Sequence, residues 1–77
     1  MGRKIKFCNR IHELRILKGL TQTELAKKAG TTQNTISSLE TGQYQPTAYL
    51  SGLICMVLGC KWEECFYYDL EGEGNNE

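Results

Sequence analysis

The sequence lacks the long apolar run that a membrane helix requires. No stretch approaches the roughly 20 apolar residues of a typical span, and the basic start MGRKIKF is not followed by the apolar segment of a signal peptide. The chain also has one histidine among 77 residues, no serine, histidine and aspartate set, and no glycine-rich loop that would bind phosphates. These absences argue against a membrane protein and an enzyme, so we expect a cytoplasmic, non-catalytic protein.

Net charge is absent from the chain as a whole but not from its parts. Residues 1–61 hold all nine cations and three anions, a net charge of +6, whereas residues 62–77 hold the other six anions. Such asymmetry is more informative than the total. The basic part suits an anionic partner, and the acidic end must then point away from it. The alternative is a solvated acidic tail with no role.

A chain of this length forms one small domain with limited stability. It buries only about 60% of the surface that its unfolded form exposes, and partner subunits often add stability to such domains. We expect a single domain over residues 1–71 and a disordered acidic tail over residues 72–77.

Apolar spacing predicts a first helix and two short strands. Apolar residues recur at helical intervals from Phe7 to Leu14, and the helix should end at Gly19. Ile5 and Phe7 also alternate with lysines, which is a weak strand pattern. The segment FYYDL at residues 66–70 is rich in residues that favour strands. Pairing these two segments would tie both ends of the domain together.

Two short helices follow, separated by a short turn. Thr21 and Glu24 form a capping box, in which the hydroxyl and the carboxylate each bind a backbone N–H at the helix start. Gly30 suits the left-handed end of that helix. The next segment, TTQNTISSLETG, is polar enough for a loop, but Ile36 and Leu39 lie three apart, as on one helix face. We therefore expect a second helix there.

A charge-free helix and a single turn complete the prediction. The segment TAYLSGLICMVLG should form a helix from Pro46 or Thr47 to Leu58. It is apolar on more than one side, which indicates that more than one side is covered. KWEECF should add one turn, with its aromatic residues Trp62 and Phe66 and the intervening cysteine turned inward.

The two short helices match the helix-turn-helix signature, which is two helices joined by a brief turn that often contains glycine. Counting Gln22 as the first position, Ala26 is fifth, Gly30 ninth and Ile36 fifteenth. A small residue at Ala26 allows the helices to cross closely, and Ile36 fills the gap between them. The spacing predicts a helix-turn-helix motif over residues 22–41.

From Ile11 to Phe66 the sequence resembles the phage repressor/Cro-type helix-turn-helix domain of small bacterial and phage regulators. KGLTQTELA and TISSLETGQYQP are the most specific parts. The resemblance implies an all-α, five-helix repressor-like DNA-binding domain, with a small two-stranded sheet from the termini in stand-alone members. It implies double-stranded DNA as the partner. We expect no cofactor and no metal.

The resemblance also places the base contacts. In this motif the second helix lies in the major groove, with its N-terminal residues at the base edges. Gln33, Asn34 and Thr35 occupy those positions, and Ser37 and Ser38 lie one turn further on. Glutamine or asparagine can form two hydrogen bonds with adenine, and threonine can contact the methyl group of thymine. The alternative is a solvated helix face, which usually carries lysine and glutamate instead.

Contacts with the DNA backbone are expected on either side of this helix. Thr21 and Gln22 begin the first motif helix, whose free N–H groups favour an anion, and Gln43 and Tyr44 follow the second. The family often has lysine or arginine near residues 43–45, but this chain has none, which predicts a shallow salt dependence. The residues that would either supply cations or remain ordinary solvated side chains are Arg10, Lys18, Lys27 and Lys28.

Arg15 and Glu40 are expected to form a structural brace. In the resembled family the matching pair joins the first helix to the recognition helix, and neither residue contacts DNA. His12 is expected on the surface of the first helix.

One recognition helix contacts only a few base pairs, so we expect a repressor that binds a palindromic operator as a homodimer. The alternative is an antitoxin or interaction protein that binds a partner chain as well as DNA, through the charge-free helix 47–58 and the acidic tail. The expected dimer contact consists of Leu53, Met56, Trp62, Phe66, Tyr67 and Tyr68.

Four cysteines are unusual for such a regulator. Cys8 and His12 are four apart, so they could share a helix face and bind a metal. Cys55, Cys60 and Cys65 are spaced by five, which matches no compact zinc motif. We interpret the cysteines as buried thiols, because free cysteine packs as a small hydrophobic residue. A redox sensor and a metal site are the alternatives.

Overall fold

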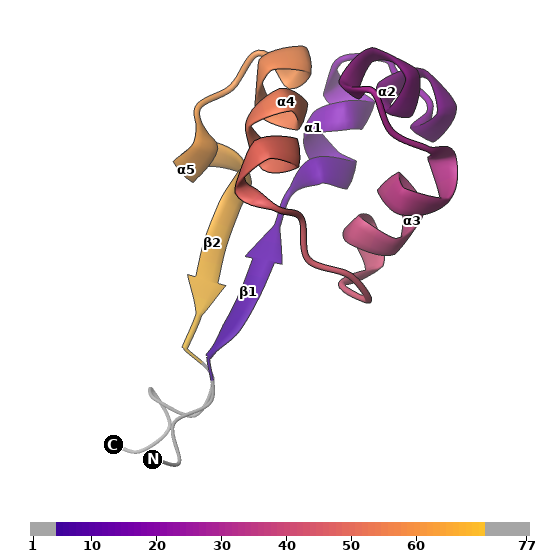
Figure 1. Cartoon of the computed structure of the whole chain (residues 1–77). Helices are drawn as coiled ribbons and strands as arrows, with labels where there is room; N and C mark the ends of the chain where they lie inside the picture. Colours follow the sequence, from indigo (N-terminus) through magenta and orange to yellow (C-terminus); the bar gives the residue numbers. More distant parts are fainter. Residues whose placement is uncertain (1–4, 71–77) are drawn as a thin grey trace.

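A computed structural model describes residues 5–70, which form five helices and a two-stranded sheet (Figure 1). None of these helices is long and apolar enough to cross a membrane. The expected five-helix domain with a small terminal sheet is confirmed, whereas the tail predicted over residues 72–77 lies outside the described residues. The elements are β1 (Lys6–Asn9), α1 (Ile11–Leu17), α2 (Gln22–Ala29), α3 (Gln33–Thr41), α4 (Ala48–Leu58), α5 (Trp62–Cys65) and β2 (Phe66–Asp69).

The sheet joins the two ends of the described chain. β1 and β2 are antiparallel, with Lys6 opposite Asp69 and Asn9 opposite Phe66. The predicted pairing is therefore correct, and the sheet extends away from the helices (Figure 1).

Phe7 lies in β1 and not in the first helix, so that part of the helix prediction is wrong. The helix begins at Ile11, whose N–H donates to the side-chain oxygen of Asn9 at 3.1 Å. Phe7 nevertheless packs against the same core as Ile11 and Leu14. The helical spacing from Phe7 onwards thus reflects a shared core and not a shared helix.

Caps and glycines set the bounds of the two motif helices. The Thr21 hydroxyl accepts from the Glu24 N–H, and the Glu24 carboxylate accepts from the Thr21 N–H at 2.8 Å. Thr32 caps α3, and Gly42 ends it in the left-handed conformation, as Gly30 ends α2. Because side chains with a Cβ are disfavoured in that conformation, these glycines end the helices sharply. The polar segment is thus a helix.

α4 begins at Ala48, since Thr47 is its cap and Pro46 precedes it. Beyond α4, Trp62 is only partly inward, with 41% of its surface exposed. Its ring stacks on Phe66 at 5.2 Å between centroids.

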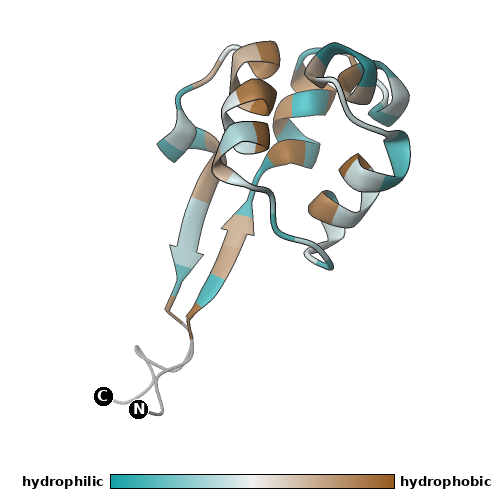
Figure 2. Cartoon of the chain, viewed as in Figure 1, coloured by the Kyte–Doolittle hydropathy of each residue, from teal (hydrophilic) through white to brown (hydrophobic). Residues whose placement is uncertain are grey.

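The core lies among the helices and reaches the start of β2. Figure 2 shows apolar residues on the helix faces that meet at the centre, with polar residues outside. Burying one large apolar side chain contributes about 1.5–3 kcal/mol to stability. Ala26 is buried where α2 packs on α3, as the motif spacing predicts. The largest fully buried side chains are Ile11, Leu25, Ile36, Leu39, Ile54, Cys65 and Phe66.

Candidate nucleic-acid interface

The outer face of α3 presents amides and hydroxyls to solvent. Gln33 and Asn34 are exposed in its first turn, and Thr35, Ser37 and Ser38 are partly exposed. The inner face is apolar and buried in the core. The expected base-contacting residues therefore lie on one uncharged helix face that is free to approach another molecule.

Tyr44 lies beside this face. Asn34, Thr35, Ser38 and Tyr44 line one open hollow of about 300 Å³. The Thr35 hydroxyl lies 2.9 Å from that of Thr32, so it also takes part in the cap of α3. Tyr44, expected at the DNA backbone, is thus placed next to three expected base contacts.

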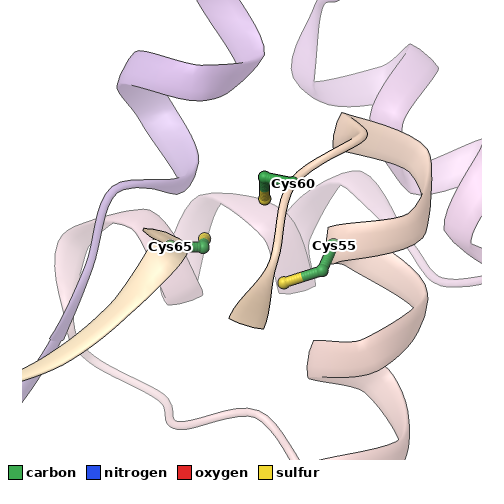
Figure 3. A group of neighbouring side chains, drawn as sticks. All are labelled: Cys55, Cys60 and Cys65. Atoms are coloured by element: carbon green, nitrogen blue, oxygen red, sulfur yellow. The ribbon is translucent and has the colours of Figure 1, made fainter. Parts of the chain in front are cut away.

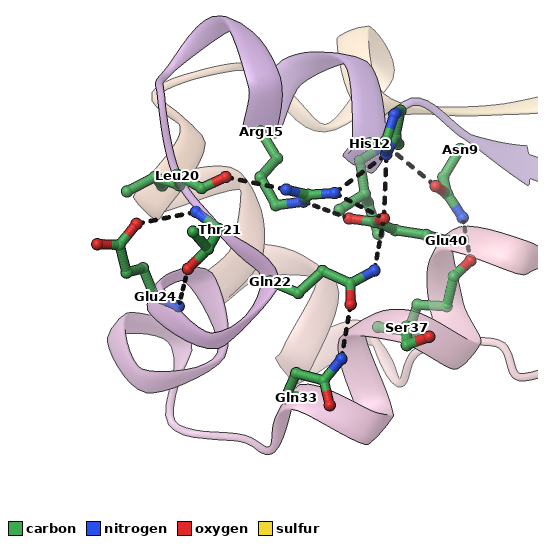
Figure 4. A network of polar contacts seen from close by, with 12 residues as sticks. Asn9, His12, Arg15, Leu20, Thr21, Gln22, Glu24, Gln33, Ser37 and Glu40 are labelled. Carbon is green, nitrogen blue, oxygen red and sulfur yellow. Dashed lines mark hydrogen bonds and ion pairs between the residues drawn. The ribbon is translucent and has the colours of Figure 1, made fainter.

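Gln22 joins α2 to α3 through its side-chain amide. Its oxygen accepts from Gln33 Nε2 at 2.6 Å, and its Nε2 donates to Glu40 Oε1 at 3.0 Å (Figure 4). The Gln33 side chain is therefore held in one orientation, which leaves its oxygen available to a base. The sequence suggested only a backbone contact for Gln22. Its positioning role depends on a fold that brings residues eleven and eighteen positions apart together.

Arg15 and Glu40 form a bidentate ion pair next to the hydrogen-bonded amides of Gln22 and Gln33. Arg15 Nε donates to Glu40 Oε2 at 2.6 Å, and Nη2 donates to Oε1 at 3.1 Å. The third nitrogen, Nη1, donates to the Leu20 carbonyl at 2.9 Å. Only 8% and 6% of the two side chains are exposed. The pair thus joins α1, the following turn and α3, as expected of a structural brace.

Two further residues complete the network, and the sequence did not point to either. His12 Nδ1 lies 3.2 Å from Glu40 Oε1, one turn before Arg15 on α1. The Asn9 amide donates to the Leu39 carbonyl at 3.0 Å, which ties the end of β1 to α3 (Figure 4). A shared helix face for Cys8 and His12 is wrong, because Cys8 belongs to β1.

The brace predicts a loss of stability in acid. Burial alone would raise the pKa of Glu40, but hydrogen bonds with Arg15, Gln22 and His12 outweigh it and lower the pKa. A lowered folded pKa contributes stability that is complete above the unfolded value of about 4.3 and is lost as the pH falls through the folded value.

As the pH falls below about 4.3, we therefore expect the melting temperature of the wild type to decrease more steeply than the melting temperature of Glu40→Gln. Thermal unfolding followed by circular dichroism from neutral pH to about pH 3 measures both slopes. If the melting temperatures of the two proteins change equally with pH, ionised Glu40 does not stabilise the folded protein.

The helix start expected to bind phosphate is partly occupied. The N–H groups of Thr21 and Glu24 are already hydrogen-bonded within the capping box, and the Glu24 carboxylate places a negative charge at the start of α2. Fewer free N–H groups therefore remain at this helix start for the predicted anion than the sequence suggested. Arg10, another expected source of charge, lies 4.2 Å over the ring of Tyr67 and contributes to packing.

Most of the expected dimer residues lie on the side of the molecule away from α3, on α4, α5 and β2 (Figure 1). Met56 is 76% exposed, and Trp62, Tyr67 and Tyr68 are exposed as well. Phe66 is only 1% exposed and stacks on Phe7 and Trp62. Its place in a dimer contact is therefore wrong, because the core of the same chain already covers it.

The fold and the exposed face of α3 define a helix-turn-helix protein. The family model described as Helix-turn-helix matches residues 11–65. The chain belongs to this family, in its phage repressor/Cro type, whose members are DNA-binding transcriptional regulators.

Relatives and solved structures agree with this membership. An uncharacterized HTH-type transcriptional regulator of Archaeoglobus fulgidus is 44% identical over 62 residues, which are 80% of this chain and 89% of the relative. YgzD of Bacillus subtilis, described in the same words, is 33% identical over 82% of this chain and 96% of its own. The clp gene regulator ClgR of Corynebacterium glutamicum is 28% identical with a TM-score of 0.68, over 70% of this chain and 57% of that chain.

Proposed function

We propose that the protein is a repressor that binds a palindromic operator as a homodimer, with α3 in the major groove. The observation that carries the proposal is the uncharged outer face of α3, on which Gln33 is held by Gln22. An amide fixed in this way suits the two-hydrogen-bond contact with adenine. The relatives described as transcriptional regulators support the same function. Such a regulator acts where the DNA is, and we place it in the cytoplasm.

Selection of binding sites from random DNA tests this function directly. We expect the purified protein to recover a palindrome whose half-sites lie about 34–36 Å apart, or a multiple of that spacing. Because α3 carries no lysine or arginine, raising the salt concentration should weaken DNA binding less than it does for a protein that makes many phosphate contacts. Recovery of no common sequence would contradict the proposal.

The dimer is proposed to form through an apolar surface that we call the partner surface. It consists of the partly buried Leu53 and the exposed Met56, Trp62, Tyr67 and Tyr68. Large exposed apolar patches on soluble proteins mark interaction sites. This surface lies away from α3, so two subunits could join there and leave both recognition helices free.

Met56→Glu is expected to convert the dimer to a monomer without unfolding it, because Met56 is exposed and a charge there would be buried by the partner. Sedimentation velocity measures the change, and circular dichroism checks the fold. Leu17→Glu is the matched control, since Leu17 is 81% exposed on α1 and outside the partner surface. A monomer with Leu17→Glu and a dimer with Met56→Glu would place the contact elsewhere.

The second candidate function is an antitoxin or interaction protein that binds another chain as well as DNA. The same partner surface favours it, because a different protein could cover these side chains equally well. Co-purification of a second chain in stoichiometric amount would favour this function, and a homodimer alone would favour the repressor.

A further inference from the structure

Three cysteines that follow one another at intervals of five residues meet at one point of the fold. Cys55 lies on α4, Cys60 in the loop after it and Cys65 at the end of α5 (Figure 3). Their three sulfur atoms all lie within 4.8 Å of one another. None of the three is used by the interface on α3, and Cys8 lies apart from them in β1.

The spacing of the sulfurs suits a single bound ion. Three sulfurs around one ion, at a typical metal–sulfur distance of about 2.3 Å, lie at most about 4 Å from one another, and they lie closer where a lone pair on the ion makes the arrangement pyramidal. Small side-chain rotations would bring the observed sulfurs to that separation. Cys60 is only partly buried, so an ion could reach the group from the surface at the loop. Thiolates select soft ions, and oxygen-preferring ions such as Mg²⁺ are disfavoured.

The surroundings restrict the charge that the complex can carry. Cys55 and Cys65 belong to the apolar core beside Ile11, Leu58 and Phe66, and the group of three includes no histidine or carboxylate among the described residues. A charge left uncompensated in such a place is costly. Three thiolates leave two negative charges with monovalent copper and one with zinc. They leave none with trivalent arsenic or antimony.

We propose that Cys55, Cys60 and Cys65 form a binding site for one trivalent thiophilic ion of the arsenic and antimony class, held by three sulfurs. Arsenous acid is neutral and carries three hydroxyl groups. Each arsenic–oxygen bond is replaced by an arsenic–sulfur bond, and each thiol proton leaves with the hydroxide as water. The reaction consumes no oxidant or reductant and places no net charge in the core.

The protonation of the thiols agrees with this chemistry. Burial raises the pKa of the Cys55 thiol and raises that of Cys65 to about 11. These two thiols are poor nucleophiles at neutral pH, which disfavours a peroxide sensor that depends on a thiolate at Cys55 or Cys65. Exchange with arsenous acid begins and ends with neutral groups, so the raised pKa values do not oppose the overall reaction.

Native mass spectrometry of the reduced full chain with sodium arsenite tests the proposal. The expected product has gained one arsenic atom and lost three hydrogens. Cys60→Ser is the preferred variant, because Cys60 is the most accessible of the three. It should weaken binding by more than the roughly 10–100-fold that loss of a supporting partner costs at a metal site.

Cys8→Ser is the matched control and should bind arsenite as the wild type does, because Cys8 lies in β1. Circular dichroism shows whether each variant is folded, and the wild-type measurement does not depend on any variant. No arsenic in the wild type, loss of only two hydrogens, or unchanged binding by folded Cys60→Ser would overturn the proposal. Stoichiometric zinc that arsenite does not displace would overturn the assignment to trivalent ions. The measurement requires no DNA, so it is independent of the proposed repressor function.

Discussion

Replacing Glu40 with alanine is expected to lower the free energy of unfolding by about 3–5 kcal/mol, because it leaves the buried Arg15 guanidinium without its ion-pair partner. For a domain of this size each kcal/mol shifts the melting temperature by about 4–8 °C. The variant should therefore melt at least about 12 °C lower, as measured by differential scanning calorimetry. Glu40→Gln should fall between the wild type and Glu40→Ala, since an amide oxygen still accepts a hydrogen bond.

Two comparisons isolate the ion pair. Glu13→Ala removes an exposed glutamate from α1, and it should change stability by no more than about 0.5 kcal/mol. The double variant Arg15→Met with Glu40→Leu removes both charges, and it should recover much of the loss because no buried charge is left unpaired. If Glu40→Ala has the same melting temperature as the wild type, the ion pair contributes nothing to the stability of the fold.

Replacing Asn34 with alanine is expected to reduce affinity for the selected operator by about 5–150-fold, which corresponds to about 1–3 kcal/mol for one base contact. Affinity for random DNA should not change, because that binding depends on phosphates. Asn34 is exposed and outside the core, so the fold should be retained. Fluorescence anisotropy measures the affinity for the selected operator and the affinity for random DNA, and the ratio of the two gives the specificity. Equal losses on the two DNAs would show that Asn34 contributes no sequence specificity.

Gln33→Ala should act in the same way, and Gln22→Ala should reproduce part of its effect without removing a base contact. The reason is that Gln22 holds the Gln33 amide at 2.6 Å. A double variant should then lose less than the sum of the two single losses, as expected of coupled residues. Strictly additive losses would show that the hydrogen bond between the two amides does not affect binding.

Local chemistry explains what the sequence could predict. The capping box of Thr21 and Glu24 and the glycines at 30 and 42 act over a few residues, so their patterns set the helix bounds directly. The offsets from Gln22 to Ile36 identify the motif because two adjacent helices pack in only a few ways. A family pattern supplied the pair of Arg15 and Glu40, since nothing local joins residues twenty-five positions apart.

The remaining features depend on contacts between distant segments. Asn9 and His12 enter the polar network only because β1 and α1 lie against the end of α3. The sequence indicates both an inward position and a partner contact for Phe66. The inward position is correct, because the antiparallel sheet places Phe66 on Phe7 and leaves it 1% exposed. The convergence of the three cysteines also required the path of the loop after α4, which a spacing of five does not predict.

The pairing of β1 with β2 has a consequence for how the domain folds. Lys6 and Asp69 are more than sixty positions apart, so their contact closes a loop that spans nearly all of the described residues. The contacts between α2 and α3 close a far shorter one. Because loop closure costs more entropy as the loop grows, and distant contacts slow folding, we expect the recognition motif to assemble early and the strands to pair late. The segment that folds last then carries Tyr67 and Tyr68. The proposed self-association through these residues would therefore follow the folding of each chain.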